Sequence, residues 1–178
     1  MTPAGHPAWA PTLETDRLVL REHRMADFDE HLAMWRDPAV IRFLGGDPYP
    51  RDQIWARFLR HVAMWQMLGF GSWAVEEKAT GRMIGQVGFH DFKRVIEPSL
   101  EGTLEIGWVF RADVHGKGMA SEAIGASLAW GVQNCPDKRI TCMIDPDNTA
   151  SLRVAARHDF REFARASYQD KPIILLEK

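Results

Sequence analysis

The residues best suited to chemistry form a glycine-rich stretch, His115-Gly116-Lys117-Gly118-Met119-Ala120-Ser121, between a predicted strand and a predicted helix. Glycines let the backbone turn several N–H groups toward one point, and the first turn of a helix adds N–H donors that lack partners. With the helix dipole, these donors form a site for a phosphate or diphosphate, and Lys117 would add charge at its rim. An ordinary tight strand-to-helix turn has the same composition, so the stretch alone leaves both interpretations open.

Two common phosphate-binding motifs match this stretch poorly. A P-loop would need a glycine where Arg111 stands and a hydroxyl residue where Gly118 stands. A dinucleotide-binding fingerprint would need a third glycine where Ser121 stands, although Asp137 lies about as far downstream as a ribose-binding acid would. Too little chain follows to complete a doubly wound parallel sheet. The P-loop is therefore excluded, and a dinucleotide-binding protein remains the weaker alternative.

Other catalytic centres lack their signatures. The seven histidines are scattered along the sequence without a His-x-x-x-His pair, and the two cysteines, Cys135 and Cys142, lack zinc-ligand spacing. No Gly-x-Ser-x-Gly elbow indicates a Ser–His–Asp hydrolase. We therefore expect no metal site.

Composition and charge narrow the class of protein. The chain has 178 residues, of which 46% are hydrophobic and 26% charged, as in ordinary globular domains. A formal net charge of −2 provides no basic face for nucleic acid. No apolar run is long enough for a membrane span, and no signal-peptide pattern or disulfide framework is present. We expect one cytoplasmic domain over residues 1–178, with residues 1–11 as a flexible N-terminal extension.

The order of predicted elements indicates an α+β fold. Hydrophobic patterns and turn residues predict strands at 13–21, 72–77, 83–92, 103–110, 139–144, 160–168 and 172–176. They predict helices from Asp27 until Pro38 ends the pattern, and at 51–68, 119–134 and 148–159. Short connections between strands favour antiparallel pairing, and the helix at 119–134 allows one parallel βαβ crossover. The expected architecture is a mixed, mostly antiparallel central sheet of about seven strands, flanked by helices.

Element order and four motifs together resemble the GNAT N-acetyltransferase superfamily, specifically its ribosomal-protein-type branch. The family's diphosphate loop, Gln/Arg-x-x-Gly-x-Gly/Ala, is matched here by the glycine-rich stretch, followed by Ser121-Glu122-Ala123 where the branch often has Thr-Glu-Ala. The other three motifs are Glu14-Thr15-Asp16-Arg17-Leu18-Val19-Leu20-Arg21, Leu104-Glu105-Ile106-Gly107-Trp108 and Asn148-Thr149-Ala150-Ser151-Leu152-Arg153-Val154-Ala155. The resemblance extends from about Leu13 to the C-terminus, and its motifs occur in the family's order.

The chain departs from this pattern at two positions. His115 replaces the usual Gln or Arg, which leaves the backbone donors intact but changes what the side chain contributes to the phosphates. Asp159 stands where the branch commonly has Gly before a strand, and Asp tolerates a left-handed cap less well. We expect the second departure to cost stability rather than function.

The resemblance implies direct attack of an amine on the thioester carbonyl of acetyl-CoA. An alkylammonium has no lone pair, so a proton must leave before the nitrogen can attack. The candidate base is Glu105, acting through a water, and a backbone N–H near Val109 is the donor for the developing oxyanion. Because a carboxylate within a strand often faces solvent, a purely structural role for Glu105 remains equally open.

The helix predicted at 148–159 supplies further candidates. Asp147 or Asn148 suits a helix N-cap, and the resemblance adds for Asn148 a hydrogen bond to the pantetheine arm. Ser151 could reprotonate the leaving thiolate, with Tyr168 as a competing acid. Arg153 and Arg157, on the same helix, could reach the 3′-phosphate of CoA, although exposed helix arginines are usually just solvated.

The resemblance thus predicts transfer of an acetyl group from acetyl-CoA to a primary amine, either a protein N-terminus or a small molecule such as a polyamine, amino acid or antibiotic. Acceptors would enter past the first helices and the loops at 45–50 and 94–101. A non-catalytic CoA-binding domain of the same fold is the main rival, and a homodimer is left open. The expected cofactor-binding residues are Trp108, Val109, Phe110, His115, Gly116, Lys117, Gly118, Met119, Ala120, Ser121, Asn148, Ser151 and Arg153.

Overall fold

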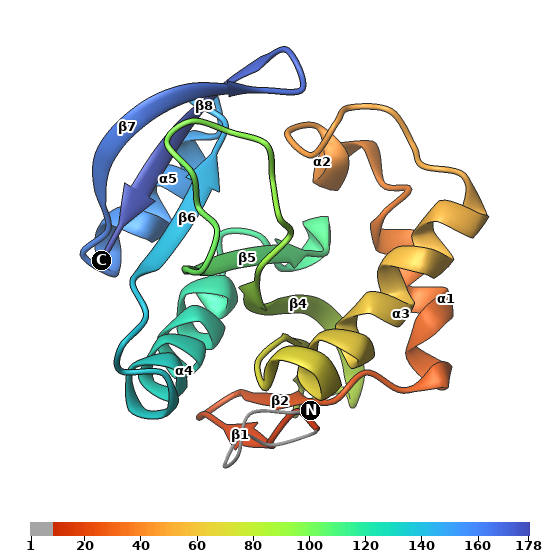
Figure 1. Ribbon diagram of the computed structural model, residues 1–178. Helices are drawn as coiled ribbons and strands as arrows, with labels where there is room; N and C mark the ends of the chain where they lie inside the picture. The colour runs from red at the N-terminus through yellow and green to blue at the C-terminus, as the bar shows by residue number, and fades with distance from the viewer. Residues whose placement is uncertain (1–8) are drawn as a thin grey trace.

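An eight-stranded sheet forms the centre of the computed structural model, which describes residues 9–178 (Figure 1). The strands lie in the order β1-β2-β3-β4-β5-β6-β8-β7. Every neighbouring pair is antiparallel except β5 and β6, which α4 joins by a crossover. The strands are β1 (Leu13–Glu14), β2 (Leu18–Arg21), β3 (Ser72–Glu77), β4 (Arg82–His90), β5 (Leu104–Phe110), β6 (Ile140–Ile144), β7 (Arg161–Tyr168) and β8 (Lys171–Glu177).

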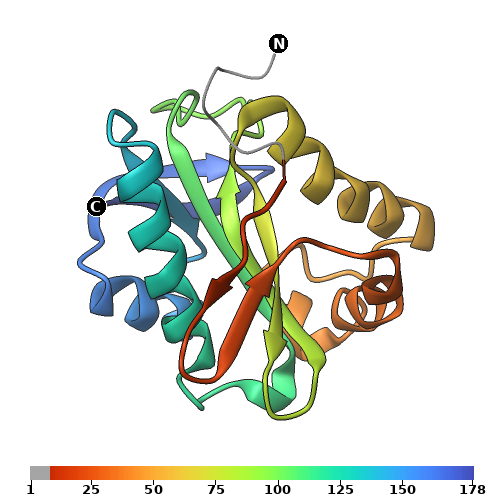
Figure 2. The same cartoon turned by 90° about the horizontal axis from the view of Figure 1, so that it is seen from below.

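Helices cover both faces of this sheet (Figure 2). Two lie on one face, α4 (Met119–Asn134) and α5 (Thr149–Arg157). The other face carries α1 (Phe28–Met34), α2 (Pro38–Ile41) and α3 (Arg51–Leu68). Two short 3-10 helices, Met25–Asp27 and Ala112–Val114, precede α1 and α4. The predicted mixed, mostly antiparallel α+β architecture with one crossover is confirmed.

Separate hydrophobic clusters hold these layers together. One lies between the sheet and α4, where Phe89, Ile106 and Ile124 are buried. A second lies beneath α1 and α3 and includes Phe58 and Met83. Because side chains alternate across a strand, β5 contributes to both layers: Ile106 packs toward α4, and Val109 packs against the second cluster.

The parallel strands β5 and β6 separate soon after they meet. Their register contains two pairs, Leu104 with Ile140 and Glu105 with Thr141. Beyond Glu105, β5 continues to Phe110 and pairs with β4 alone among the strands at residues 9–178. In Figure 1, β5 runs to the right and β6 runs upward, so the two strands move apart. One edge of β5 is therefore left without a strand partner in the middle of the sheet.

Two predicted elements near the N-terminus were wrong in detail. The strand expected at 13–21 is a hairpin, because Thr15 closes a turn: its N–H donates to the Leu18 carbonyl at 3.0 Å, and its hydroxyl accepts from the Leu18 N–H at 3.0 Å. Pro38 does not simply end a helix. It begins α2, with Asp37 capping the N–H of Ala39 at 2.9 Å, since proline lacks an N–H and suits a first helical position.

Other boundaries agree closely with the sequence patterns. The helix predicted at 119–134 is α4, and Gly81 closes the β3–β4 hairpin at φ 66°. Asp159 has φ 65°, the left-handed cap expected there. The predicted N-terminal extension falls mostly outside the described residues; at its end, the Pro11 carbonyl accepts a 2.7 Å hydrogen bond from Trp73. No helix within residues 9–178 is long and apolar enough to cross a membrane.

Candidate active site

The predicted diphosphate loop has the backbone that its glycines suggest. Gly116 and Gly118 have φ of 75° and 79°, in the left-handed region that L side chains rarely adopt. Gly118 is the N-cap of α4, and the first helical bond runs from the N–H of Glu122 to the Gly118 carbonyl at 3.1 Å. The N–H groups of the preceding residues therefore have no partner within the helix. These donors, at the positive end of the helix dipole, suit an anion.

The N-terminal hairpin braces this loop from behind. The Glu122 carboxylate, in the first turn of α4, accepts a 2.6 Å bond from the Thr15 hydroxyl and a 2.7 Å bond from Arg17 Nε. Arg17 Nη1 also donates to the Lys117 carbonyl at 3.0 Å. The motif at residues 14–21 and the glycine-rich loop with its first helical turn are far apart in the sequence. They thus form one polar network that holds the loop against β2.

The side chains of the loop have structural partners of their own. The exposed His115 places its ring Nε2 2.9 Å from the Phe110 carbonyl, which ties the loop to the end of β5. The Ser121 hydroxyl lies 3.0 Å from Nε2 of His158, at the end of α5. Phe110 and Met119 are buried in the core beneath α4, and Ala120 packs against it. For these residues the backbone, rather than the side chain, remains available to a ligand.

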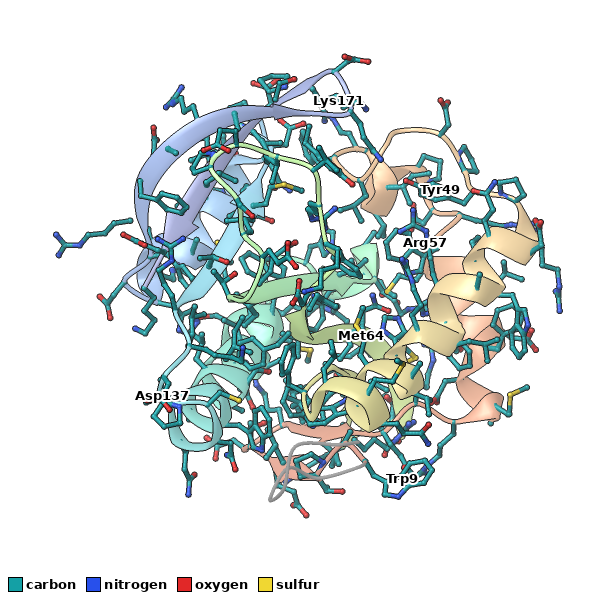
Figure 3. The ribbon with its side chains drawn as sticks, in the orientation of Figure 1. Trp9, Tyr49, Arg57, Met64, Asp137 and Lys171 are labelled. Atoms are coloured by element: carbon teal, nitrogen blue, oxygen red, sulfur yellow. The ribbon has the colours of Figure 1, made fainter. Side chains whose placement is uncertain are left out.

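A cleft of about 590 Å³ occupies the gap between β5 and β6. Of the predicted site residues, the cleft lining includes Glu105, Trp108, Val109, Asn148 and Ser151, and the competing acid Tyr168 lines it too. The loops that contain Gly45, Tyr49 and Arg94 also contribute, as does the inner side of α3. In Figure 3, Tyr49 and Arg57 lie side by side on that inner side, and Lys171 extends from the β7–β8 hairpin toward them.

Glu105 does not face solvent. Only 7% of the residue is exposed, and its carboxylate forms a fork-like pair with Arg94: Nε lies 2.9 Å from Oε2 and Nη2 lies 2.9 Å from Oε1. Burial opposes the charge on Arg94, but hydrogen bonding and attraction to Glu105 outweigh it, so the pKa of Arg94 is raised. The solvent-facing interpretation of Glu105 was therefore wrong.

Arg94 is held from both sides, although the sequence patterns did not single it out. Its guanidinium lies over the rings of Phe92 at 4.7 Å and Tyr168 at 4.9 Å. The loop that carries Arg94 is anchored by two apolar side chains, Ile96 and Leu100, buried in the cluster beneath β8. The loop was expected to border the acceptor entrance, but nothing local in the sequence pairs Arg94 with Glu105.

The start of α5 lies on the β6 side of the cleft. Asn148 is the helix N-cap, as predicted, and its Oδ1 accepts a 3.1 Å bond from the N–H of Ser151. Ser151 is half-buried and one helical turn further on. Arg153 is exposed and is not among the residues that line the cleft. The structure therefore brings Asn148 and Ser151 together with Glu105 and leaves Arg153 on the outer surface.

Three of the histidines that are scattered along the sequence lie close together in the fold. The rings of His23 and His61 stack with centroids 4.3 Å apart, and His31 lies edge-on to His61 at 5.5 Å. Burial lowers the pKa of His23 to about 3, that of His31 to about 4 and that of His61 well below 6.5. These rings come from three separate elements, which no local spacing reveals. The described residues contain no group of three His, Cys, Asp or Glu side chains arranged to hold a metal ion.

Comparison with known proteins decides the family. The model of the acetyltransferase (GNAT) domain matches residues 17–161 of this chain. The protein is a member of the GNAT acetyltransferase family. The uncharacterized N-acetyltransferase YnaD of Bacillus subtilis is 41% identical to this GNAT protein over 149 residues, which cover 84% of this chain and 82% of YnaD. The family resemblance read from the sequence motifs is therefore confirmed.

Solved GNAT structures share the fold. An acetyltransferase from Agrobacterium tumefaciens is 28% identical, with a TM-score of 0.82 over 95% of this chain and 94% of that one. The ribosomal L7/L12 α-N-protein acetyltransferase RimL, solved with coenzyme A, has a TM-score of 0.75 over 94% of this chain and 97% of RimL. At 14% identity, the likeness to RimL is one of fold alone.

Proposed function

We propose that this GNAT protein transfers an acetyl group from acetyl-CoA to a primary amine by direct attack of the amine on the thioester. The observation that carries the proposal is the unpaired edge of β5, which runs along the cleft toward the glycine loop at the start of α4. This arrangement suits a long molecule with an anionic end and an amide-containing arm. Its anionic end would lie on the loop and its arm beside β5.

The residues present fit CoA in two respects. The N–H groups at the start of α4 would donate hydrogen bonds to the diphosphate, as those of helix N-termini commonly do. Backbone groups of β5 between Gly107 and Val109, free of a second strand, would bind the amides of the pantetheine arm as another strand would. RimL, which has this fold, was solved with coenzyme A, and that supports CoA as a ligand of this chain.

The chain's own residues would transfer two protons, one from the ammonium group of the acceptor and one to the leaving thiolate. Bound acetyl-CoA supplies the acyl carbon and the thiolate leaving group. Glu105 would accept the ammonium proton through a water, since a carboxylate has acceptor capacity beyond the bonds it makes to Arg94. Ser151 would donate a proton toward sulfur, and a backbone N–H near Val109 would stabilise charge on the carbonyl oxygen. In the whole transfer, a carbon–nitrogen bond forms and a carbon–sulfur bond breaks.

A thermal-shift screen followed by an amine panel tests this proposal. CoA should raise the melting temperature, whereas NAD, ATP and DNA should not, because a ligand that binds only the folded state stabilises it. Acetyl-CoA should then release free thiol in the presence of some primary amine. Binding of CoA without thiol release from any amine would support the non-catalytic rival, and a response to NAD alone would support the dinucleotide alternative.

The cytoplasmic location belongs to the same proposal. Cys135 and Cys142 are both buried and unpaired, as is usual for proteins of reducing compartments. The same cysteines bear on the mechanism. Burial raises the pKa of both thiols, so neither is activated as a thiolate nucleophile. This supports direct transfer to the amine rather than transfer through a cysteine.

A further inference from the structure

The wall of the cleft opposite β5 is cationic. Arg57 and Arg60 lie one turn apart on the side of α3 that lines the cleft, and Lys171 lines it from the β7–β8 hairpin. With Arg94, four cationic side chains line the cleft against two carboxylates, Glu105 and Asp145, in a chain whose formal net charge is −2. The Arg94–Glu105 pair neutralises itself. The remaining lining therefore carries an excess of positive charge.

Arg57 and Arg60 have aromatic supports but no acid partners. The guanidinium of Arg57 lies 4.1 Å from the centre of the Tyr49 ring, and that of Arg60 lies 5.3 Å from the centre of the Phe92 ring. Across the described chain, neither guanidinium has an ion pair with a carboxylate. Burial and then the nearby Arg57 and Arg94 charges lower the pKa of Arg60. The aromatic rings therefore orient these two guanidiniums, and neither has a carboxylate as its partner.

A second, independent observation points to a ligand at the same place. Gln86 and His90, on the cleft face of β4, are each 6% exposed and line the cleft. Within residues 9–178, His90 Nδ1 has no hydrogen-bond partner. The His90 ring lies above Gly107, where an added Cβ would be 3.2 Å from its Cε1. Because buried polar atoms are normally paired, the unpaired His90 Nδ1 indicates a polar ligand between β4, β5 and α3.

We propose that the acceptor carries a carboxylate close to its primary amine and that Arg57 and Arg60 bind this carboxylate. The inference rests on the proposed acetyl transfer and names its substrate class. Planar guanidiniums match a carboxylate in a two-pronged geometry, and the surrounding aromatic rings reduce competition from water. The same positive charges favour the neutral amine over the ammonium and repel acceptors with further cationic groups. Amino acids or peptides with an acidic N-terminal residue fit this description, and polyamines do not.

Matched pairs of amines test the inference. Free amino acids are compared with their carboxamides, and tripeptide amides that begin with Asp or Glu with their Asn or Gln counterparts; spermidine serves as the cationic probe. The measurements are kcat/KM from thiol release and calorimetric affinity for the CoA-loaded chain. We expect the anionic member of each effective pair to be preferred by about 10- to 100-fold, the range for hydrogen bonds to charged groups. The response of the free amino acids relative to the peptides identifies the source of the carboxylate.

Three arginine variants complete the test. Arg57→Gln and Arg60→Gln should each remove most of the preference, whereas Arg51→Gln should keep it. Arg51 is the matched control: it lies on the same helix and over the Phe28 ring at 5.0 Å, outside the cleft. If Arg57→Gln melts early because it loses its ring contacts, Arg60→Gln decides.

The outcomes separate this inference from the proposed function. Three outcomes overturn the carboxylate inference while leaving acetyl transfer intact. They are equal or better use of neutral amines, no binding of any anionic amine, and a preference for the anionic amine that survives in both Arg57→Gln and Arg60→Gln. Calorimetric binding of the anionic members that depends on Arg57 and Arg60, without thiol release, supports the carboxylate site and contradicts the transfer. Failure to bind CoA contradicts the proposed function itself.

Discussion

The guanidinium of Arg94 holds both carboxylate oxygens of Glu105, with three N–H···O contacts between 2.9 and 3.2 Å. This pair joins the loop after β4 to the strand that borders the gap between β5 and β6. It orients the proposed base and holds Glu105 in the buried lining of the cleft rather than in open solvent. The proposed chemistry therefore depends on a contact between two segments that the chain brings together only on folding.

Loss of Arg94 should destabilise the protein strongly. Arg94→Gln leaves the buried Glu105 carboxylate without its cation, and removal of one partner of a buried pair costs about 3 to 5 kcal/mol of unfolding free energy. Some of this cost will be recovered by water at the cleft. Urea denaturation measures the change, and Arg165→Gln, which breaks the exposed pair with Glu162, should leave the midpoint unchanged. A cost no greater than in the control would show that the pair is structurally unimportant.

Replacement of the proposed base should slow turnover without loss of CoA. Glu105→Gln keeps the size of the side chain but removes its basic oxygen, and loss of a general base typically lowers the rate about 10² to 10⁴-fold. Turnover should recover as the pH approaches the pKa of the acceptor amine, where free amine no longer needs the base. The control is Glu162→Gln on the exposed face of β7. Wild-type turnover by Glu105→Gln at every pH would leave Glu105 as a strand residue only.

The glycine loop can be tested with a paired substitution. Gly118→Val and Gly81→Val both place a branched side chain at positive φ, 79° and 66°, so each should cost about 1 to 2 kcal/mol of stability. Only Gly118→Val should also weaken CoA binding, by about tenfold or more, because its side chain would stand where the diphosphate approaches the backbone. Calorimetry with CoA on both folded variants makes the comparison. Equal CoA affinity in the two would move the diphosphate site elsewhere.

Stability should fall in mild acid because of the buried histidines. An unfolded histidine titrates near 6.5, whereas burial lowers the folded pKa of His23 to about 3 and that of His31 to about 4. Between these values the unfolded chain binds more protons than the folded chain. The stability that the neutral rings provide is therefore complete above about pH 6.5 and is lost as the pH falls toward 4.

Urea denaturation between pH 4.5 and 7.5 measures this slope, which is about 1.4 kcal/mol per pH unit for each proton excluded. His23→Phe keeps an aromatic ring against His61 and should flatten the slope by up to one proton. A slope that His23→Phe does not alter would assign the acid sensitivity to other groups.

The sequence determined the parts of this protein that depend on neighbouring residues. The limits of α4 follow from Gly118 before its first turn and from an apolar stripe along one side. Asn148 caps a helix and Gly81 closes a hairpin, and both roles depend on local backbone geometry. The residue type alone therefore predicts each role. The glycine loop belongs to the same class, because its use depends on φ values that few residues tolerate.

Tertiary structure decided where these parts meet. The gap between β5 and β6 arises because the strands pair at two positions and then diverge, which neither strand's pattern of hydrophobic residues encodes. The same holds for the Arg94–Glu105 pair, the stacked rings of His23 and His61, and the cationic wall at Arg57. Each of these contacts joins segments that lie far apart in the sequence. Periodicity tells which side of an element is buried but not what it is buried against. The proposed acceptor site is made almost wholly of such contacts, so only the folded chain reveals it.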